Sequence, residues 1–325
     1  MPLPFKLVYG EGYDLNLGEH VFPAVKYRLI HNQLLAEGIA EPADFVEPEP
    51  VSDIDLLRVH TAWWVDRLKN GTLSEQELLA LQIPYSPQVT AALWLATGGS
   101  IQAARLALDD GMGFNLGGGF HHAFADRGEG FCAIHDVAVA IRHWQDETAG
   151  ADRIERAMVV DLDVHQGNGT AAIFGNDPTV FTFSMHQQNN YPSEKPPSDL
   201  DVNLRDGVGD EEYLAVLAEK LPPALAGFAP DLLFYVAGAD PYAEDQLGGL
   251  RLTLDGLRER DHYVFETARR NEIPVAVVLA GGYAHNVSDT VAIHAGTVLM
   301  AREVMQAGGG DSARRRAVFD GTKEM

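Results

Sequence analysis

The sequence has a single cysteine, Cys132, no long apolar run, and far fewer basic than acidic residues. One cysteine excludes an internal disulfide and a cysteine-rich metal site. The longest apolar stretches, Leu232–Ala239 and Ile273–Ala280, have the length of strands, whereas a membrane-spanning helix needs about 20 residues. The first residues, MPLPFKLVYG, lack the basic start and apolar stretch of a secretion signal, so we expect a cytoplasmic protein without a membrane span.

The shortage of basic residues bears on possible partners. The 325 residues include 24 Lys and Arg against 47 Asp and Glu, a formal net charge of −23. This charge opposes non-specific binding to nucleic acid and favours cationic substrates. Many acidic proteins carry such a net charge only because it keeps them soluble. The charge does not indicate the oligomeric state.

The hydrophobic pattern predicts one α/β domain. Apolar, β-branched runs alternate with amphipathic helical stretches and no linker divides them, which is typical of a buried parallel sheet covered on both faces. We therefore expect a single doubly wound domain with a mostly parallel sheet flanked by helices. The predicted strands are Phe5–Val8, Ala157–Asp161, Val180–Ser184, Leu232–Val236 and Val275–Leu279. The predicted helices are Ser86–Asp109, Asp136–Glu147, Glu211–Leu225, Thr253–Arg270 and Val287–Gln306.

Several boundaries follow from local composition. Ser86 and Thr253 are predicted helix caps, and a proline follows Ser86. The long polar segment Gln187–Gly209 contains prolines and is predicted to be a functional loop at the rim of a site. Residues 1–307 form the predicted catalytic domain, and residues 308–325, which begin at Gly308 with GGGDSARRR, are expected to be a flexible tail.

Unusual polar residues follow the predicted strands, at the sheet edge where α/β proteins bind ligands. Asp161, Asp163 and His165 alternate after the run RAMVV and would face one side. Two carboxylates together at a buried strand end favour a bound cation, although aspartates that cap a helix are the alternative. Asp240 ends the run LFYVAGAD; it is either a turn residue or the third ligand beside Asp163 and His165. One nitrogen and two oxygen donors suit catalytic Zn²⁺, and Fe²⁺ would also fit.

Two further strand ends carry groups that could act on a metal-bound substrate. His121 and His122 follow three glycines, which allow the backbone to turn so that both rings face one site. A surface position is the ordinary alternative for such a pair. Tyr283 follows Gly281 and Gly282 and is either a packing residue or a hydrogen-bond donor to a developing oxyanion.

Taken together, these segments make the sequence similar to the histone deacetylase superfamily, with its arginase-like α/β fold. The matching stretches are LLRVHTAWWVDRL (56–68), NLGGGFHHAFADRGEGFC (115–132), VVDLDVHQGNGTAAIF (159–174), VFTFSMH (180–186), AGADPYAEDQLGG (237–249) and LAGGY (279–283). They cover roughly residues 5 to 300 in the family's order. The motifs GGGFHH, DRGEGFC and DVHQGNGT most resemble the class IV branch and bacterial deacetylase-like amidohydrolases.

The resemblance implies a zinc-dependent hydrolase that cleaves the linear amide of an acyl-lysine protein or peptide. It makes Asp163, His165 and Asp240 the zinc ligands. His121 and His122 become the general acid and base. The remaining catalytic roles fall to Tyr283 as the donor to the oxyanion, Asp161 as the partner of His121, and Asn168 behind His122.

The resemblance also implies an ion site and a substrate tunnel. A structural K⁺ would bind Asp161, Asp163, Ser184 and the backbone carbonyls of His165 and Met185. The tunnel for the acyl-lysine chain would be lined by Gly130, Phe131, Tyr191 and Leu247.

One departure concerns Asn168, because many relatives have a carboxylate at this position. A neutral amide would still orient His122 but would stabilise its imidazolium less.

Three other functions remain. An acetylpolyamine or other small-amide hydrolase would use the same chemistry on a different acylated amine. An arginase-like binuclear enzyme would need more aspartates where Gln166, Asn168 and Pro241 stand. A non-catalytic module that binds acyl-lysine or metal would have no use for the histidine pair and Tyr283.

Overall fold

The structure is a computed structural model that describes residues 2–148 and 154–320. Eight strands form one sheet in the order β2-β1-β3-β8-β7-β4-β5-β6, and every neighbouring pair is parallel. The predicted parallel sheet is therefore confirmed. The strands are β1 (Lys6–Val8), β2 (Phe45–Val46), β3 (Met112–Asn115), β4 (Ala157–Asp161), β5 (Val180–Gln187), β6 (Leu200–Leu204), β7 (Leu232–Val236) and β8 (Val275–Val278).

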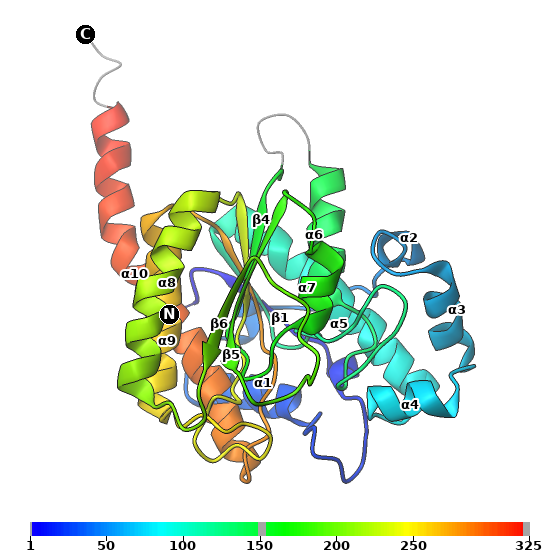
Figure 1. The fold of residues 1–325 in the computed structure, drawn as a ribbon. Helices are drawn as coiled ribbons and strands as arrows, with labels where there is room; N and C mark the ends of the chain where they lie inside the picture. The colour runs from blue at the N-terminus through cyan, green and yellow to red at the C-terminus, as the bar shows by residue number, and fades with distance from the viewer. Residues whose placement is uncertain (1, 149–153, 321–325) are drawn as a thin grey trace.

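Helices cover both faces of this sheet (Figure 1). Two short 3₁₀ turns, Glu11–Tyr13 and Pro42–Asp44, accompany them. The α-helices are α1 (Lys26–Ala36), α2 (Asp53–Leu56), α3 (Ala62–Asn70), α4 (Glu75–Leu81), α5 (Pro87–Asp110), α6 (Asp136–Glu147), α7 (Asn168–Phe174), α8 (Asp210–Phe228), α9 (Leu254–Arg270) and α10 (Val287–Asp320).

The central strands β7 and β8 are apolar at every position, and β4 is apolar up to its last residue, because both faces of these strands are buried. Along β4, Val159 belongs to the core shared with α5 and α6, whereas Met158 and Val160 belong to the core that includes buried residues of α8, α9 and α10. This alternation follows from the two-residue period of a strand. An unbroken apolar run is therefore the pattern that a strand between two helical layers requires.

The predicted helix caps are confirmed. The Ser86 hydroxyl accepts a hydrogen bond from Val89 N at 3.1 Å, with Pro87 as the first helical residue. Thr253 accepts one from Gly256 N at 3.0 Å. Each side chain satisfies a backbone N–H that the first helical turn leaves without a partner.

Two predictions of local structure need correction. The segment Gln187–Gly209 is not a single loop, because Leu200–Leu204 forms edge strand β6. This strand escaped prediction because only Val202 and Leu204 are buried in it, so its pattern is half polar. Helix α10 continues to Asp320 instead of ending at Gln306, consistent with the helix-favouring alanine and arginine residues of ARRRA. Residues 321–325 of the predicted tail lie outside the described residues, and the domain boundary at residue 307 stays a prediction.

Four neighbouring strands end level with one another and so define the floor of a site. The last residues of β3, β8, β7 and β4 pair in one row, Asn115 with Val278, Val278 with Val236, and Val236 with Asp161. The segments that follow these strands carry the polar residues singled out from the sequence. Their convergence is a direct result of the parallel register.

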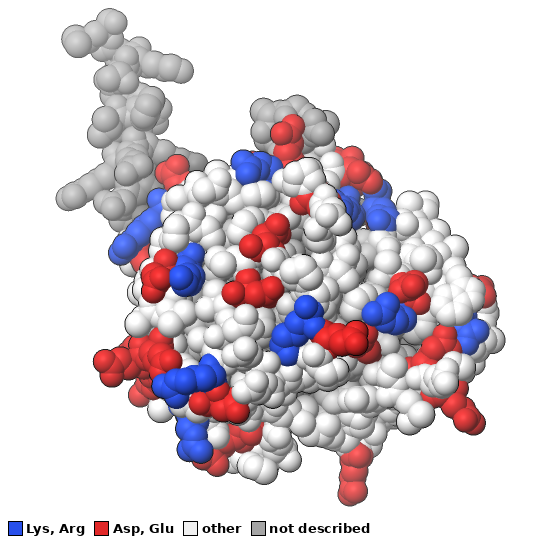
Figure 2. Space-filling model, viewed as in Figure 1, with Lys and Arg blue, Asp and Glu red and all other residues white. Residues whose placement is uncertain are grey.

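The chain as a whole is acidic, and the face drawn in Figure 2 carries charges of both signs. Figure 2 shows one face, on which the described Lys and Arg side chains are scattered, many of them beside Asp and Glu, instead of forming one basic patch. Within the described residues, no helix combines the length and the apolar character needed to cross a membrane.

Candidate active site

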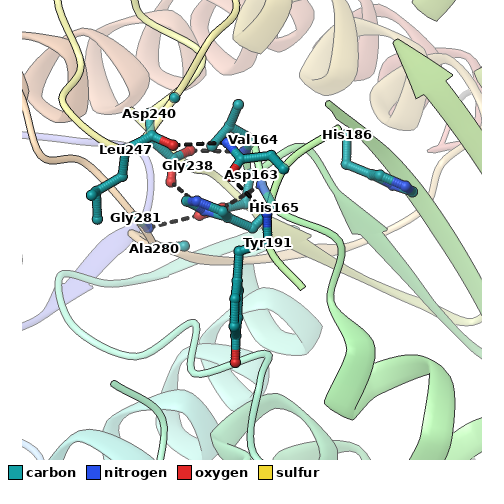
Figure 3. A network of polar contacts seen from close by, with 12 residues as sticks. Asp163, Val164, His165, His186, Tyr191, Gly238, Asp240, Leu247, Ala280 and Gly281 are labelled. Atoms are coloured by element: carbon teal, nitrogen blue, oxygen red, sulfur yellow. Dashed lines mark hydrogen bonds and ion pairs between the residues drawn. The ribbon is translucent and has the colours of Figure 1, made fainter. Parts of the chain in front are cut away.

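Asp163, His165 and Asp240 come together beyond the ends of β4 and β7. All three are buried, and one candidate ligand atom from each lies within 4.8 Å of the others. His165 Nδ1 is 3.0 Å from Asp163 Oδ1 and 3.3 Å from Asp240 Oδ2. The structure therefore brings together the three ligands predicted from two separate segments. Figure 3 shows them converging, whereas His186 lies away from the cluster.

Backbone N–H groups hold both carboxylates in place. Asp163 Oδ2 accepts a hydrogen bond from Gly281 N at 3.0 Å, and Asp240 Oδ1 accepts one from Val164 N at 2.8 Å (Figure 3). Each bond joins the segments that follow two different strands. The loops after β4, β7 and β8 are thereby tied together around the cluster.

The geometry and charge of the cluster fit a bound cation. Asp240 Oδ2 is buried and forms no hydrogen bond. Burial and the neighbouring Asp163 raise the pKa of Asp240 to about 7, so the charge of this carboxylate is poorly compensated by the protein alone. A Cβ at Gly281 would lie 2.1 Å from Asp240 Oδ2 and 2.4 Å from Asp163 Oδ2. The missing side chain thus leaves room beside the carboxylate oxygens, and the N/O/O donor set suits Zn²⁺ or Fe²⁺.

The two histidines reach the cluster because of the glycine loop after β3. Gly118 and Gly119 have φ values of 81° and 75°, which side-chain-bearing residues rarely adopt. The buried Asp136 at the start of α6 holds this loop by accepting hydrogen bonds from Gly119 N at 3.0 Å and Phe120 N at 2.8 Å. The centroids of the His121 and His122 rings are only 4.1 Å apart. The tight turn therefore places neighbouring side chains on the same side.

The histidines have different partners and opposite electrostatic environments. His121 Nδ1 is 2.7 Å from Asp161 Oδ2, and His122 Nδ1 is 2.7 Å from Asn168 Oδ1. Burial opposes protonation of His121, but Asp161 and Asp163 outweigh it and raise its pKa to about 9. Burial, His121 and His165 hold the pKa of His122 well below its usual value. A cation beside Asp163 would lower the pKa of His121 in turn. His122 is the histidine that the protein keeps neutral.

Tyr283 is buried beside the cluster, with its ring centroid 6.4 Å from that of His165. Burial raises the pKa of its hydroxyl well above the usual value, and Asp163 and Asp240 raise it further. The phenol therefore remains protonated. Its role as a donor to the oxyanion of a metal-bound substrate stays a prediction.

Two residues that position the Tyr283 segment were not predicted. The buried Asp245 accepts a hydrogen bond from Tyr283 N at 2.6 Å and another from Leu247 N at 2.8 Å. The buried Lys26 donates to the Ala280 carbonyl oxygen, and burial lowers its pKa to about 8. Asp245 lies in the conspicuous stretch AGADPYAEDQLGG, but no sequence signal distinguishes Lys26 from a surface lysine.

A cavity of about 340 Å³ is lined by His122, His165 and Tyr283 of the candidate site. Its wall includes all four predicted tunnel residues, Gly130, Phe131, Tyr191 and Leu247. The four remaining wall residues, which come from distant segments and were not predicted, are His20, Val21, Gln82 and Asn190.

The segments of the predicted potassium site also lie side by side. Asp161 on β4 and Ser184 on β5 are paired in register. The Ser184 hydroxyl is 2.9 Å from His186 Nδ1, and Asp161 Oδ1 accepts a hydrogen bond from Asp163 N at 3.1 Å. Binding of K⁺ by Asp161, Asp163, His165, Ser184 and Met185 stays a prediction.

Comparison with known proteins identifies the family. The model of the histone deacetylase domain matches residues 20–298. The chain is 42% identical over 301 residues to an uncharacterized protein of Picosynechococcus sp., covering 92% of this chain and 99% of that protein. It is 34% identical to histone deacetylase 2 of Arabidopsis thaliana (88% and 76% covered). It is also 32% identical to a histone deacetylase-like amidohydrolase of Pseudomonas aeruginosa (81% and 72% covered).

A solved structure shares the fold. The crystal structure of the HDA15 HD domain superposes with a TM-score of 0.75 at 24% sequence identity, covering 92% of this chain and 89% of that one. The predicted arginase/deacetylase-like architecture is thus confirmed, and with it the prediction of a hydrolase of the deacetylase type. The family model, the relatives and the fold agree, and this chain belongs to the histone deacetylase family.

Proposed function

We propose that this protein is a zinc-dependent deacylase that hydrolyses the amide bond of acyl-lysine at a single metal ion. One observation carries the proposal: a three-ligand cluster, a histidine pair and a tyrosine lie together, and one member of each group (His165, His122 and Tyr283) lines the same cavity. A ligand set with two carboxylates and one imidazole leaves coordination positions for water and substrate.

Each group has a chemical role in this proposal. The bound cation would supply Lewis acidity toward the acyl carbonyl and toward water. His122, kept neutral by its surroundings, accepts the proton of the attacking water, and His121 beside Asp161 holds the proton that the leaving amine requires. Tyr283 donates its hydroxyl hydrogen to the developing oxyanion.

The binuclear alternative has little support from the surrounding residues. Gln166, which stands where a further ligand would be needed, donates from Nε2 to Pro196 O at 2.8 Å and Asp201 Oδ1 at 2.9 Å. Asn168 is engaged with His122. Among the described residues, only one group of three acidic, histidine or cysteine side chains is close enough to hold a metal ion. These contacts favour one catalytic metal.

A panel of substrates tests the proposed activity. Acyl-lysine peptides and N-acetylated polyamines are assayed side by side for kcat/KM with zinc-loaded protein. We expect the peptides to be hydrolysed more efficiently. Preference for polyamines would make the chain a small-amide hydrolase, and absence of turnover with binding of the acyl-lysine peptide would favour the non-catalytic module.

Acyl length is a separate prediction that rests on the class IV resemblance of GGGFHH, DRGEGFC and DVHQGNGT. Class IV enzymes are known for removing long acyl groups, so we expect octanoyl- or myristoyl-lysine to be hydrolysed at least as efficiently as acetyl-lysine. Each buried methylene contributes about 0.8 kcal/mol, and four would raise kcat/KM by about two orders of magnitude.

The glycines of the site do not themselves open a channel for such a chain. A Cβ at Gly119 would meet Ala280 Cβ at 2.7 Å, and one at Gly281 would meet Asp240. Their role is close packing around the cluster. The measurement compares kcat/KM for acetyl, butyryl, octanoyl and myristoyl forms of one peptide, and a steady fall from acetyl onward would show a closed pocket.

The amide behind His122 gives a prediction about pH. Asn168→Asp places a carboxylate at Nδ1 of His122, which stabilises the imidazolium and raises its pKa from the depressed value of the native site. Because the base acts only when neutral, the acidic limb of the kcat/KM profile should move to higher pH. A limb that stays in place would show that His122 is not the titrating base.

A further inference from the structure

The carboxylate of Glu129 lies behind His122, but it contacts the amide of Asn168 and not the imidazole itself. Asn168 Oδ1 is 2.7 Å from His122 Nδ1, and Asn168 Nδ2 donates to Glu129 Oε2 at 3.4 Å. The same Glu129 oxygen accepts the hydroxyl hydrogen of Tyr191 at 2.9 Å. Tyr191 packs edge-on against His122, with ring centroids 4.9 Å apart. His122, Asn168, Glu129 and Tyr191 thus form one connected network.

The backbone around Glu129 gives this side chain a defined position. Glu129 and Cys132 exchange two backbone hydrogen bonds, each of 3.0 Å, across a tight turn. The two central residues, Gly130 and Phe131, have φ values of 55° and 70°. A Cβ at Gly130 would lie 2.8 Å from His122 Cδ2. This turn places Phe131 in the tunnel wall. It also places Glu129 beside Asn168, the residue that contacts His122.

An amide at position 168 has an ambiguity that a carboxylate lacks. Its oxygen accepts hydrogen bonds and its NH₂ group donates them, and the two ends have nearly the same shape. If the amide is rotated by half a turn, NH₂ faces His122 Nδ1 and favours the tautomer with the proton on Nε2. That tautomer cannot accept a proton from water at Nε2. The orientation of Asn168 therefore decides whether His122 is a competent base.

The Asn168 side chain is buried, but a cavity lies beside it. Asn168 and Glu129 both line a second cavity, of about 480 Å³, which shares Tyr191 with the tunnel wall. An ionised carboxylate is only an acceptor, so Glu129 matches the NH₂ end of Asn168 and opposes its oxygen end. Arg127 Nε lies 3.4 Å from Glu129 Oε1, the carboxylate oxygen that takes no part in the network.

We propose that Glu129 is a positioning residue that selects the orientation of the Asn168 amide and thereby the His122 tautomer with a free Nε2. This inference rests on the proposed function, in which His122 is the base. In this arrangement the neutral amide of Asn168 contacts the imidazole of His122, and the carboxylate of Glu129 contacts the amide. Tyr191 connects the same carboxylate to the substrate tunnel.

The first test compares substitutions at Glu129. In Glu129→Ala, kcat on the acyl-lysine peptide should fall by about tenfold to a hundredfold, the usual range for such supporting residues, while KM changes little. Glu129→Gln offers an acceptor to Asn168 and Tyr191 in only one of the two orientations of its amide, so its loss should be smaller than that of Glu129→Ala. Glu194→Ala, which removes an exposed carboxylate from the wall of the second cavity, is the matched control. Wild-type kcat in Glu129→Ala, or equal losses in the Ala and Gln variants, would overturn the proposal.

The second test separates orientation of the amide from general support of the loop. In an Asn168→Asp background there is no amide to orient, and two carboxylates face each other. Adding Glu129→Ala there should leave kcat unchanged or raise it. An equal loss in the wild-type and Asn168→Asp backgrounds would show that Glu129 only supports the loop.

The third test requires no turnover. The ¹⁵N chemical shifts of the His122 ring, assigned with a His122→Ala variant of the zinc-loaded protein, report its tautomer. We expect a proton on Nδ1 in the wild type and a mixture of tautomers in Glu129→Ala, with zinc content and Tm unchanged. Unchanged shifts would refute the inference even in an active deacylase. A changed tautomer in a protein that hydrolyses no acyl-lysine would refute the proposed function alone.

Discussion

Replacing Asp240 with alanine is expected to abolish both metal binding and hydrolysis. Asp240 supplies one of three ligands, and its Oδ2 atom is buried without a hydrogen bond. Purified wild-type protein should contain about one tightly bound transition metal per chain, and Asp240→Ala close to none. Metal analysis of the two proteins, with kcat on the acyl-lysine peptide, makes the measurement.

Two further variants separate the loss of a metal ligand from misfolding and from a general effect of removing a carboxylate. Asp240→Asn keeps an acceptor for Val164 N, so it should fold even where alanine destabilises the loop. Glu244→Ala removes an exposed carboxylate from the same loop and should keep its metal. Two equivalents of Mn²⁺ per wild-type chain together with arginase-like activity would overturn the mononuclear assignment.

Replacing Tyr283 with phenylalanine is expected to lower kcat by about 10²–10³-fold, the usual effect of removing one oxyanion donor. The buried ring is retained, and Asp245 holds the segment through Tyr283 N, which the substitution does not change. Zinc content, Tm and peptide Kd should therefore stay near the wild-type values. A loss confined to kcat is the signature of a group that acts only in the transition state.

Tyr242→Phe is the matched control for this prediction, because Tyr242 lies in the neighbouring loop and is not among the residues that line the tunnel. It should retain wild-type kcat. Near-full activity of Tyr283→Phe would make Tyr283 a packing residue. A rise in KM without a change in kcat would make it a residue for substrate binding.

The regular elements that lie between two helical layers were predicted well. Strands β4 and β7 agree with the expected residues, and β8 differs by one residue at its end, because burial on both faces leaves an unbroken apolar run. Helix α6 agrees as well. The elements that escaped prediction carry weaker signals. Strand β6 is half polar at the sheet edge, and β3 has the sequence MGFN, in which Gly113 and Asn115 are residues that strands disfavour.

The candidate site shows where local sequence stops being informative. His121, Asp163 and Tyr283 stand out because each follows a strand or a glycine turn. Lys26 and Asp245 do not, since their importance depends on contacts with backbone atoms of distant segments. Glu129 was visible only as a letter of the motif DRGEGFC, and its contact with Asn168 spans 39 positions.

The sequence by itself determined the fold class, the family resemblance and the identity of the groups that gather at the site. Hydrophobic period and glycine placement are local properties, and parallel strands bring their carboxyl ends to one edge. Only the tertiary structure decided which way each group faces, which histidine is kept neutral, and what supports Asn168. These properties depend on distances of a few ångströms between residues far apart in the chain, because burial and hydrogen bonding at that range control protonation and orientation.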